Sequence, residues 1–312
     1  MKILLLGANG QLGQTFIQHG GLAARGELVV ASRDGAQGEA IDLSAPDTLP
    51  AQLDRLRPQL IVNTAAYTTV DRAEQEEALA TRVNGEAVGV IGVWAAKHGA
   101  LVAHYSTDYV FNGSQPTPYT ESDTPAPINA YGRSKLAGEL ALLDSGAAHL
   151  TFRTAWVYAA HGHNFLRTML RLGAERDELR VVDDQHGTPT DTSLIVDVTL
   201  AALDRWQNAD AAERGQLQGL HHLVASGATT WHGFAGAIFE QAVIHGLLSR
   251  APRLIPIPAA DYPTPARRPV WSLLDTTRLR SRLGIDLPDW RNRLQHVITR
   301  MAPPNNTPTR RT

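Results

Sequence analysis

Short aliphatic runs alternate with longer amphipathic stretches over the first 150 residues of the chain. Each aliphatic run has the length and composition of a buried strand, and the runs lie at Ile3–Leu6, Leu28–Ala31, Leu60–Asn63, Leu101–Tyr105 and Leu150–Arg153. The stretches between them have apolar positions at helical spacing, which predicts helices over residues 12–20, 71–81, 85–98 and 131–144. Because strands that alternate with helices form βαβ units with right-handed crossovers, we expect a doubly wound α/β domain with a parallel sheet.

This alternation ends near residue 155. Helical patterns follow at 164–173, 191–206, 231–245 and 290–301, together with one short strand at 221–224. Residues 251–269 are rich in proline and basic side chains, which predicts an irregular, extended loop. We therefore expect a first domain over residues 1–156, to which segments near 191–226 return, and a smaller, partly interleaved substrate-binding part over 157–302. Residues 303–312 are expected to be a flexible tail.

The composition narrows the class of protein. The 312 residues include 29 basic and 31 acidic side chains, so no strong charge field points to nucleic acid or an anionic membrane. The chain has no cysteine, which excludes disulfides, thiolate zinc sites and cysteine nucleophiles. The first apolar run covers only residues 3–6, whereas a signal peptide needs roughly 7–15 apolar residues and a membrane span about 20. We expect a cytoplasmic monomer or homodimer.

A glycine-rich turn follows the first predicted strand directly and leads into the first predicted helix. Glycine in such a turn lets the backbone approach a pyrophosphate closely, and the helix N-terminus favours its negative charge. The position between a strand and a helix makes this pattern typical of a Rossmann dinucleotide site. The candidate cofactor-binding residues are Gly7, Gly10, Gln11, Leu12 and Gly13.

The end of the second predicted strand normally contacts the adenosine ribose. Ser32 and Arg33 follow that strand, and no acidic residue ends it directly. Since an acidic group there repels a 2′-phosphate, we expect NADPH to be accepted at least as well as NADH. A solvated Arg33 remains the alternative. Asp42 and Leu43 are candidates for the wall beside the adenine, and the small residues Thr64, Ala65 and Ala66 would let the cofactor approach the sheet edge.

Tyr131 and Lys135 stand four residues apart in a predicted helix, so their side chains share one face. A free tyrosine, with a pKa of about 10, is a poor acid–base group at neutral pH. We expect the neighbouring ammonium to lower that pKa and to make proton exchange with an alcohol or ketone feasible. On its own this spacing also fits two surface residues.

Hydroxyl side chains follow the strand-like run that ends at Tyr105. In an open α/β sheet the carboxyl edge is where ligands bind, so Ser106 or Thr107 could hydrogen-bond the same substrate oxygen as Tyr131. The glycine turn, these hydroxyls and the tyrosine–lysine pair therefore converge on one crevice. This combination indicates a nicotinamide-dependent oxidoreductase.

Several longer runs resemble the dTDP-4-dehydrorhamnose reductase family, within the extended short-chain dehydrogenases. The similar runs extend from residue 3 to about 290, and they are Gly7–Gly13, Val62–Asp71, Tyr105–Phe111, Tyr131–Lys135, Phe152–Tyr158, Asn164–Phe165 and Tyr262–Pro269. The resemblance implies Thr107, Tyr131 and Lys135 as the catalytic set, with Tyr131 and Lys135 also touching the cofactor. It implies Asp108, Tyr109, Trp156 and Arg268 as contacts to a dTDP-sugar, with Trp156 near the methyl group of the deoxysugar.

The resemblance also implies a reaction. NADPH or NADH would reduce the C4 ketone of dTDP-4-dehydro-L-rhamnose to dTDP-L-rhamnose, the last step toward a sugar used in cell-surface polysaccharide such as O-antigen. Two alternatives stay open: another nucleotide-sugar enzyme of the superfamily, an epimerase or dehydratase, and a non-catalytic, dinucleotide-binding regulatory subunit. Dehydratases tend to carry an acidic residue after the Thr-Asp pair, where this chain has Tyr109.

Metal binding is not expected. Members of the family share a magnesium ion between subunits through glutamates, but Ser193 and Arg291 stand where those glutamates would be, and an arginine cannot bind a cation. The histidine clusters also lack a third ligand. Two groups are interpreted as structural: the carboxylates from Asp71 to Glu77 as a solvated helix face, and a set of tryptophans as packing residues. The residues concerned are His161, His163, His221 and His222; Asp71, Glu74, Glu76 and Glu77; and Trp94, Trp231 and Trp290.

Overall fold

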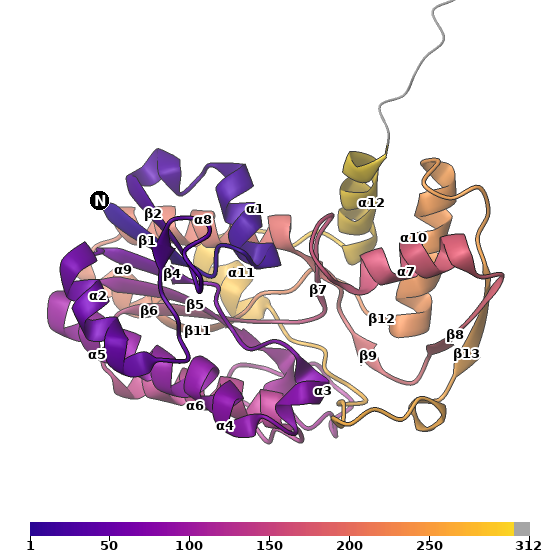
Figure 1. Ribbon diagram of the computed structural model, residues 1–312, viewed down its shortest axis with the longest axis horizontal. Coiled ribbons are helices and arrows are strands. Elements are labelled where there is room, and N and C mark those ends of the chain that lie inside the picture. The colour runs from indigo at the N-terminus through magenta and orange to yellow at the C-terminus, as the bar shows by residue number, and fades with distance from the viewer. Residues whose placement is uncertain (303–312) are drawn as a thin grey trace, which may run out of the picture.

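A parallel sheet of seven strands forms the centre of the N-terminal half (Figure 1). The computed structural model describes residues 1–302, so the predicted tail at 303–312 lies outside the described residues. The strand order is β11-β6-β5-β4-β1-β2-β3, and every neighbouring pair is parallel. The strands are β1 (Lys2–Leu6), β2 (Glu27–Ser32), β3 (Glu39–Ala40), β4 (Leu60–Asn63), β5 (Leu101–Thr107), β6 (His149–Thr154) and β11 (Gly219–His222).

Both faces of this sheet are buried, as β1 shows. Ile3 and Leu5 point into one apolar core, and Leu4 and Leu6 into the other, because successive side chains of a strand alternate between its faces. The first core is covered by α1 (Gln11–His19) and α8 (Thr192–Asn208), and the second by α2 (Leu49–Leu56), α5 (Ala87–His98) and α6 (Ala130–Asp144). The predicted doubly wound, Rossmann-type sheet is confirmed.

The order in which the chain adds strands to the sheet reverses next to β1. The chain passes from β1 outward through β2 and β3 on one side, and from β4 through β5, β6 and β11 on the other. Ligands of open α/β sheets bind in the crevice outside the carboxyl ends of the strands at such a point. The loops after β1, β4 and β5 are therefore the ones that line the site.

The C-terminal part is built on short two-stranded sheets, and lies at the right in Figure 1. Residues 251–269 were expected to be irregular, but β13 (Arg253–Ile257) lies in this stretch and pairs with β8 (Glu178–Val182). Pro256 is tolerated because β13 has only this one partner strand. The other elements here are α7 (Phe165–Glu175), α10 (Trp231–Ile244) and α12 (Trp290–Met301), with the pairs β7 (Val157–Tyr158) and β10 (Thr190–Asp191), and β9 (His186–Gly187) and β12 (Thr229–Thr230).

The prediction of one continuous helix over residues 71–81 is wrong. It consists of α3 (Val70–Ala73) and α4 (Glu77–Thr81), followed by a π-helical turn, Arg82–Glu86, that runs into α5. The buried Asn84 side chain in this turn donates to Ser134 Oγ and exchanges two hydrogen bonds with the backbone of Tyr67. The helices that the hydrophobic pattern did not predict are α2, α9 (Ala211–Leu217), α11 (Thr277–Leu283) and the 3₁₀ turns at Ala23–Arg25, Pro46–Thr48, Asp108–Val110 and Ala259–Asp261. The short strands β3, β7, β8, β9, β10 and β12 were not predicted either.

Of the helices within residues 1–302, none is both long and apolar enough to cross a membrane. The longest, α8, packs against α1, where Thr15 Oγ1 donates to Thr192 Oγ1 at 2.8 Å. The segments after residue 190 that contribute α8 and β11 thus belong to the sheet and its covering layer.

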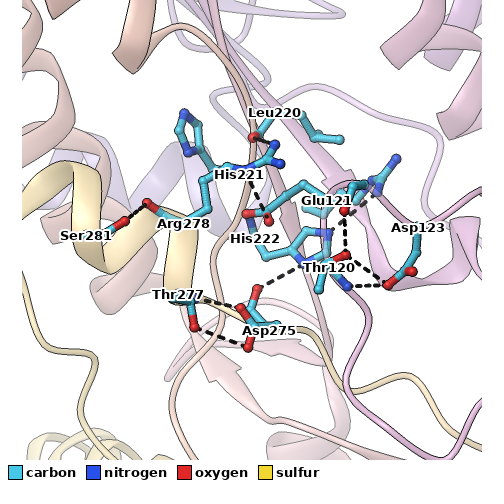
Figure 2. Close-up of polar contacts among 12 residues, drawn as sticks. Thr120, Glu121, Asp123, Leu220, His221, His222, Asp275, Thr277, Arg278 and Ser281 are labelled. Carbon is cyan, nitrogen blue, oxygen red and sulfur yellow. Dashed lines mark hydrogen bonds and ion pairs between the residues drawn. The ribbon is translucent and has the colours of Figure 1, made fainter.

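The outer edge of β11 is closed by side chains rather than by another strand (Figure 2). The Glu121 carboxylate, only 3% exposed, accepts the backbone N–H of His222 at 3.0 Å and lies 3.5 Å from the Arg278 guanidinium. His222 Nδ1 lies 3.1 Å from the carbonyl oxygen of Asp275. Burial lowers the pKa of His221 to about 4 and that of His222 to about 3, so both rings are neutral at pH 7. Glu121 therefore joins three distant segments at this edge.

We predict that Glu121→Ala lowers the free energy of unfolding by about 1–3 kcal/mol, because a buried N–H then lacks an acceptor. Urea unfolding followed by circular dichroism measures this loss. Glu175→Ala is the matched control, since Glu175 pairs with Arg171 on the exposed face of α7 and such pairs contribute about 0–1 kcal/mol. Equal destabilisation by the two variants would contradict the role of Glu121.

Candidate active site

The turn after β1 is built for close approach of a phosphate group. Gly7 has φ +84°, and a β-carbon there would lie 2.5 Å from the backbone nitrogen of Ala65. A β-carbon at Gly13 would lie 2.3 Å from the Gly7 carbonyl oxygen, whereas Gly10 is much less crowded. Within residues 1–302 no side chain caps the start of α1. Its first N–H groups are thus free for an anion, and the turn fits a dinucleotide pyrophosphate.

The residues beside this turn come from both halves of the chain. Gln11 Oε1 accepts a hydrogen bond from Asn164 Nδ2 at 2.7 Å, and the Gln11 carbonyl lies 3.1 Å from His161 Nε2. Thr64 Oγ1 donates to the Leu6 carbonyl, which places Thr64, Ala65 and Ala66 against the turn. His161 thus holds the phosphate loop. Leu12 follows Gln11 and is half-buried.

The end of β2 differs from the expectation based on sequence. Ser32 is buried, and its hydroxyl donates to Asp34 Oδ1 at 3.0 Å, so its proton already has an acceptor. Asn9 Nδ2 and the backbone N–H of Ala36 also point to Asp34, and hydrogen bonding from Ala36 and Ser32 lowers the pKa of that carboxyl. Arg33 is exposed. An anionic carboxylate therefore stands two residues beyond the strand, beside the cationic Arg33.

Asp42 and Leu43, the proposed adenine wall, follow the short edge strand β3. Leu43 is buried in the core beneath α2. Asp42 Oδ1 accepts the backbone N–H of Ser44 at 2.9 Å, which keeps this turn in place.

The end of β5 carries a hydrogen-bonded pair. Thr107 Oγ1 donates to Asp108 Oδ1 at 3.0 Å and accepts the backbone N–H of Tyr109 at 3.2 Å. Burial raises the pKa of Asp108 to about 6. The Tyr109 ring meets the Tyr131 ring edge-on at 6.0 Å, which places Tyr131 beside this pair.

Tyr131 lies in the first turn of α6, and two polar side chains position that turn. Asn129 Oδ1 accepts the N–H of Gly132 at 2.7 Å, and Glu74 Oε1 accepts the N–H of Ala130 at 2.7 Å. Burial and the Asp108 carboxylate raise the pKa of Tyr131 to about 12, while hydrogen bonding from Thr107 opposes the rise. The expected lowering of this pKa is therefore wrong for the protein without a ligand. A phenol of this kind is fully protonated at pH 7.

Lys135 lies one turn further along α6 and is only 2% exposed. Its Nζ lies 3.5 Å from Nε2 of His104, and the Nδ1 of that buried ring lies 3.2 Å from Asn63 Nδ2. Burial lowers the pKa of Lys135 to about 8, and burial and Lys135 hold the pKa of His104 well below its usual range. The lysine is thus buried beside a neutral histidine.

Three buried oxygens at this sheet edge have no hydrogen-bond partner among the residues that the structure describes: Ser106 Oγ, Asp108 Oδ2 and Thr154 Oγ1. Thr154 ends β6 and is the sheet neighbour of Thr107. Unsatisfied buried polar atoms are rare in folded proteins. Their concentration here fits a ligand rich in hydroxyl groups.

Trp156 and Arg268 come from different segments. Trp156 follows β6 and stacks on Trp231, with ring centroids 3.5 Å apart. Arg268 Nη1 and Nη2 lie 3.0 and 2.9 Å from the Asp71 carboxylate, and hydrogen bonding from Arg268 lowers the pKa of Asp71. Arg268 also lies close enough to Tyr109 for each to influence the pKa of the other. The contacts of these residues to a substrate stay predictions.

Comparison with known proteins agrees with this geometry. A family model described as RmlD substrate binding domain matches residues 1–302. The chain belongs to this family. The dTDP-4-dehydrorhamnose reductase of Burkholderia thailandensis is 48% identical over 293 residues, which cover 93% of this chain and 96% of that protein. The resemblance inferred from the sequence motifs is confirmed.

Two solved structures extend the comparison. A dTDP-4-dehydrorhamnose reductase from Clostridium acetobutylicum has a TM-score of 0.85 at 32% identity, covering 96% of this chain and 98% of that one. The enzyme from Bacillus anthracis, solved in complex with NADP, has a TM-score of 0.84 at 30% identity, covering 96% and 99%. The fold is thus that of the RmlD family over nearly its whole length.

The carboxylates from Asp71 to Glu77 are exposed or partly exposed, as their spacing suggested, and they also have partners on other elements. Besides Asp71 and Glu74, Glu76 accepts the Tyr67 hydroxyl at 2.7 Å and Glu77 pairs with Arg133 at 2.7 Å. These residues connect α3 and α4 to α6 and to the loop that carries Arg268. Among them Glu74 contacts the first turn of α6, which carries Tyr131.

No cluster of three or more metal-ligating side chains occurs within residues 1–302. The Arg291 guanidinium lies over the Trp290 ring at 4.4 Å, and Ser193 lies in the first turn of α8. Arg293 pairs with the buried Asp191 at 2.8 Å. That no metal binds between RmlD subunits here stays a prediction.

His104, Asn63 and Thr154 were missed as site residues. Each lies within or at the end of a buried strand whose side chains were interpreted as packing. The signal was a polar residue inside an otherwise aliphatic run, since buried polar groups need partners. Glu139, one turn beyond Lys135 on α6, was also missed, and it forms a buried bidentate pair with Arg153.

We predict that Lys135→Met stabilises the ligand-free protein at pH 7. The folded-state pKa of Lys135, about 8, lies below the unfolded value, so the penalty of burying the charge is full below pH 8 and disappears as pH rises toward the unfolded value. The shift corresponds to about 3 kcal/mol. Denaturant unfolding from pH 7 to 9.5 measures the effect, with the exposed Lys97→Met as control. A Lys135→Met protein that is less stable at pH 7 would contradict it.

Proposed function

We propose that this enzyme reduces the C4 ketone of dTDP-4-dehydro-L-rhamnose to dTDP-L-rhamnose, using NADPH or NADH. The observation that carries the proposal is the position of Tyr131 beside Tyr109 and Thr107 at the carboxyl end of β5, where buried oxygens of Asp108 and Thr154 lack partners among the described residues. The curated relatives are reductases of this name, and the Bacillus anthracis enzyme binds NADP.

The chain's own residues account for the proton half of the reaction. The bound nicotinamide supplies a hydride to the carbonyl carbon, and the carbonyl oxygen needs one proton to become the alcohol. Tyr131 donates that proton, and its raised pKa keeps the donor loaded at pH 7. An alkoxide is a stronger base than a phenolate, so it takes the proton from Tyr131.

Thr107 and Asp108 orient the substrate. Thr107, whose hydroxyl is held by Asp108, lies next to the Tyr131 phenol, and we assign it to orient the ketone beside that phenol. Asp108 Oδ2 stays available for a sugar hydroxyl. Lys135 is buried on the same face of α6 as Tyr131, and its amine would hold the nicotinamide ribose of the bound cofactor.

The two rival functions make different demands. An epimerase or dehydratase regenerates its cofactor in each cycle, whereas a reductase consumes it stoichiometrically. A regulatory subunit needs no proton donor, yet this chain retains Thr107, Tyr131 and Lys135. The cytoplasmic location and the monomeric or dimeric state stay predictions.

We predict that Tyr131→Phe lowers kcat by about 10²–10⁴-fold, the usual contribution of a positioned acid. The measurement follows the absorbance of NADPH with dTDP-4-keto-6-deoxyglucose and a 3,5-epimerase that supplies the ketone. Tyr119→Phe is the control, because the Tyr119 hydroxyl hydrogen-bonds Asn112 and its ring stacks on Phe111. Near-normal turnover by Tyr131→Phe would refute the acid role, and no stoichiometric NADPH consumption by the native enzyme would refute the function.

We predict opposite effects of the two charges after β2 on cofactor choice. Asp34→Ala removes an anion that repels a 2′-phosphate, so the ratio of kcat/KM for NADPH over NADH should rise by at least about fivefold. Arg33→Ala should lower the same ratio. Steady-state kinetics with both cofactors decide the matter, and a ratio unaffected by either change would place the ribose elsewhere.

A further inference from the structure

The backbone of Trp156 adopts an unusual conformation. Its φ is +47°, and Arg57 is the only other non-glycine residue in the described chain with positive φ. This left-handed region disfavours residues with a bulky side chain by about 1–3 kcal/mol, so it persists only where the surroundings enforce it. The neighbours of the Trp156 side chain must therefore enforce this backbone conformation.

Trp231 provides the first contact. The two indole rings are nearly parallel, at 5°, with their centroids 3.5 Å apart. Trp231 is the first residue of α10, whose start is capped by Thr230 Oγ1 at 3.0 Å from the Gly233 nitrogen, and its ring also packs on Phe165 at 4.7 Å. The stacking partner is therefore itself fixed in position.

Gly187 provides the second contact. A β-carbon at this position would lie 2.4 Å from Cε2 of Trp156 and 2.6 Å from Nε1, so the glycine backbone presses against the fused edge of the indole. Gly187 is paired with Thr229 in the β9–β12 ladder. Because β12 leads directly into Trp231, a single two-stranded ladder sets both neighbours of Trp156.

The same indole follows the carboxyl end of β6, next to the end of β5. Trp156 is two residues beyond Thr154, the sheet neighbour of Thr107. It packs against the apolar cluster that contains Val110 and Phe111, which follow Tyr109 directly. The indole thus links the end of the sheet to the C-terminal part.

We propose that Trp231 and Gly187 are positioning residues that hold the indole of Trp156 as a rigid wall of the sugar site. This inference rests on the proposed function, because it assigns the wall to the site of the dTDP-linked ketosugar. Neither residue needs to touch the cofactor. Loss of either should therefore weaken sugar binding and leave dinucleotide binding intact.

Three variants test the wall. Trp231→Ala removes the stacking partner, Trp231→Phe restores most of it, and Gly187→Ala pushes a methyl group into the indole while Trp231 stays. We expect Trp231→Ala and Gly187→Ala to raise KM for the ketosugar by about tenfold, with KM for NADPH changed less than about twofold. Trp231→Phe should recover most of the loss. Trp206→Phe is the control, since Trp206 of α8 lies beside Arg214 of α9.

A second readout does not depend on turnover. Closely stacked indoles couple their electronic transitions, so the unliganded protein should show an exciton couplet in circular dichroism that Trp231→Phe abolishes and Trp206→Phe keeps. Equilibrium titration with dTDP-rhamnose should show the same loss of affinity in Trp231→Ala and Gly187→Ala. Unchanged sugar KM and affinity in both would overturn the inference, as would a couplet that survives in Trp231→Phe. A native enzyme without turnover whose variants lose both couplet and affinity would instead refute only the proposed reaction.

Discussion

Burial of the Lys135 ammonium beneath α6 is the constraint on which the rest of the active site depends. Tyr131, Lys135 and Glu139 follow one another at four-residue spacing, so one stripe of α6 faces the sheet with a phenol, an amine and a carboxylate. The carboxylate is neutralised by Arg153, and the amine lies against the neutral His104. Burial of these groups in a low-dielectric layer costs free energy of folding. This cost falls on residues of the candidate active site.

The sheet could be predicted closely from the amino-acid pattern. The runs Ile3–Leu6 and Leu60–Asn63 are continuous and aliphatic because both faces of the strands are buried, and this signal needs no tertiary information. The glycine turn could also be predicted from the sequence, because contacts of the turn with itself and with Ala65 require Gly7 and Gly13. Such local, obligatory features can be predicted from sequence.

Features that depend on distant partners could not be predicted. The π-helical turn exists because Asn84 satisfies the backbone of Tyr67 and reaches Ser134, fifty residues away. Tyr131 was expected to be more acidic than a free tyrosine, but its neighbourhood is set by Asp108 and by burial rather than by the amine that follows it on the helix. Asp34 was not predicted because a carboxylate was sought at the end of the strand itself. The hydrogen bond from Ser32 directs the Asp34 carboxylate toward that strand end.

The contacts between Gln11 and the loop at 159–164 have a thermodynamic consequence. The loop holds the phosphate-binding turn through Asn164 and His161, and it also connects β7 to α7 in the C-terminal half. A displacement of that half would therefore also displace the turn that is expected to bind the pyrophosphate. If sugar binding displaces that half, the sugar and the dinucleotide alter each other's affinity by the same factor.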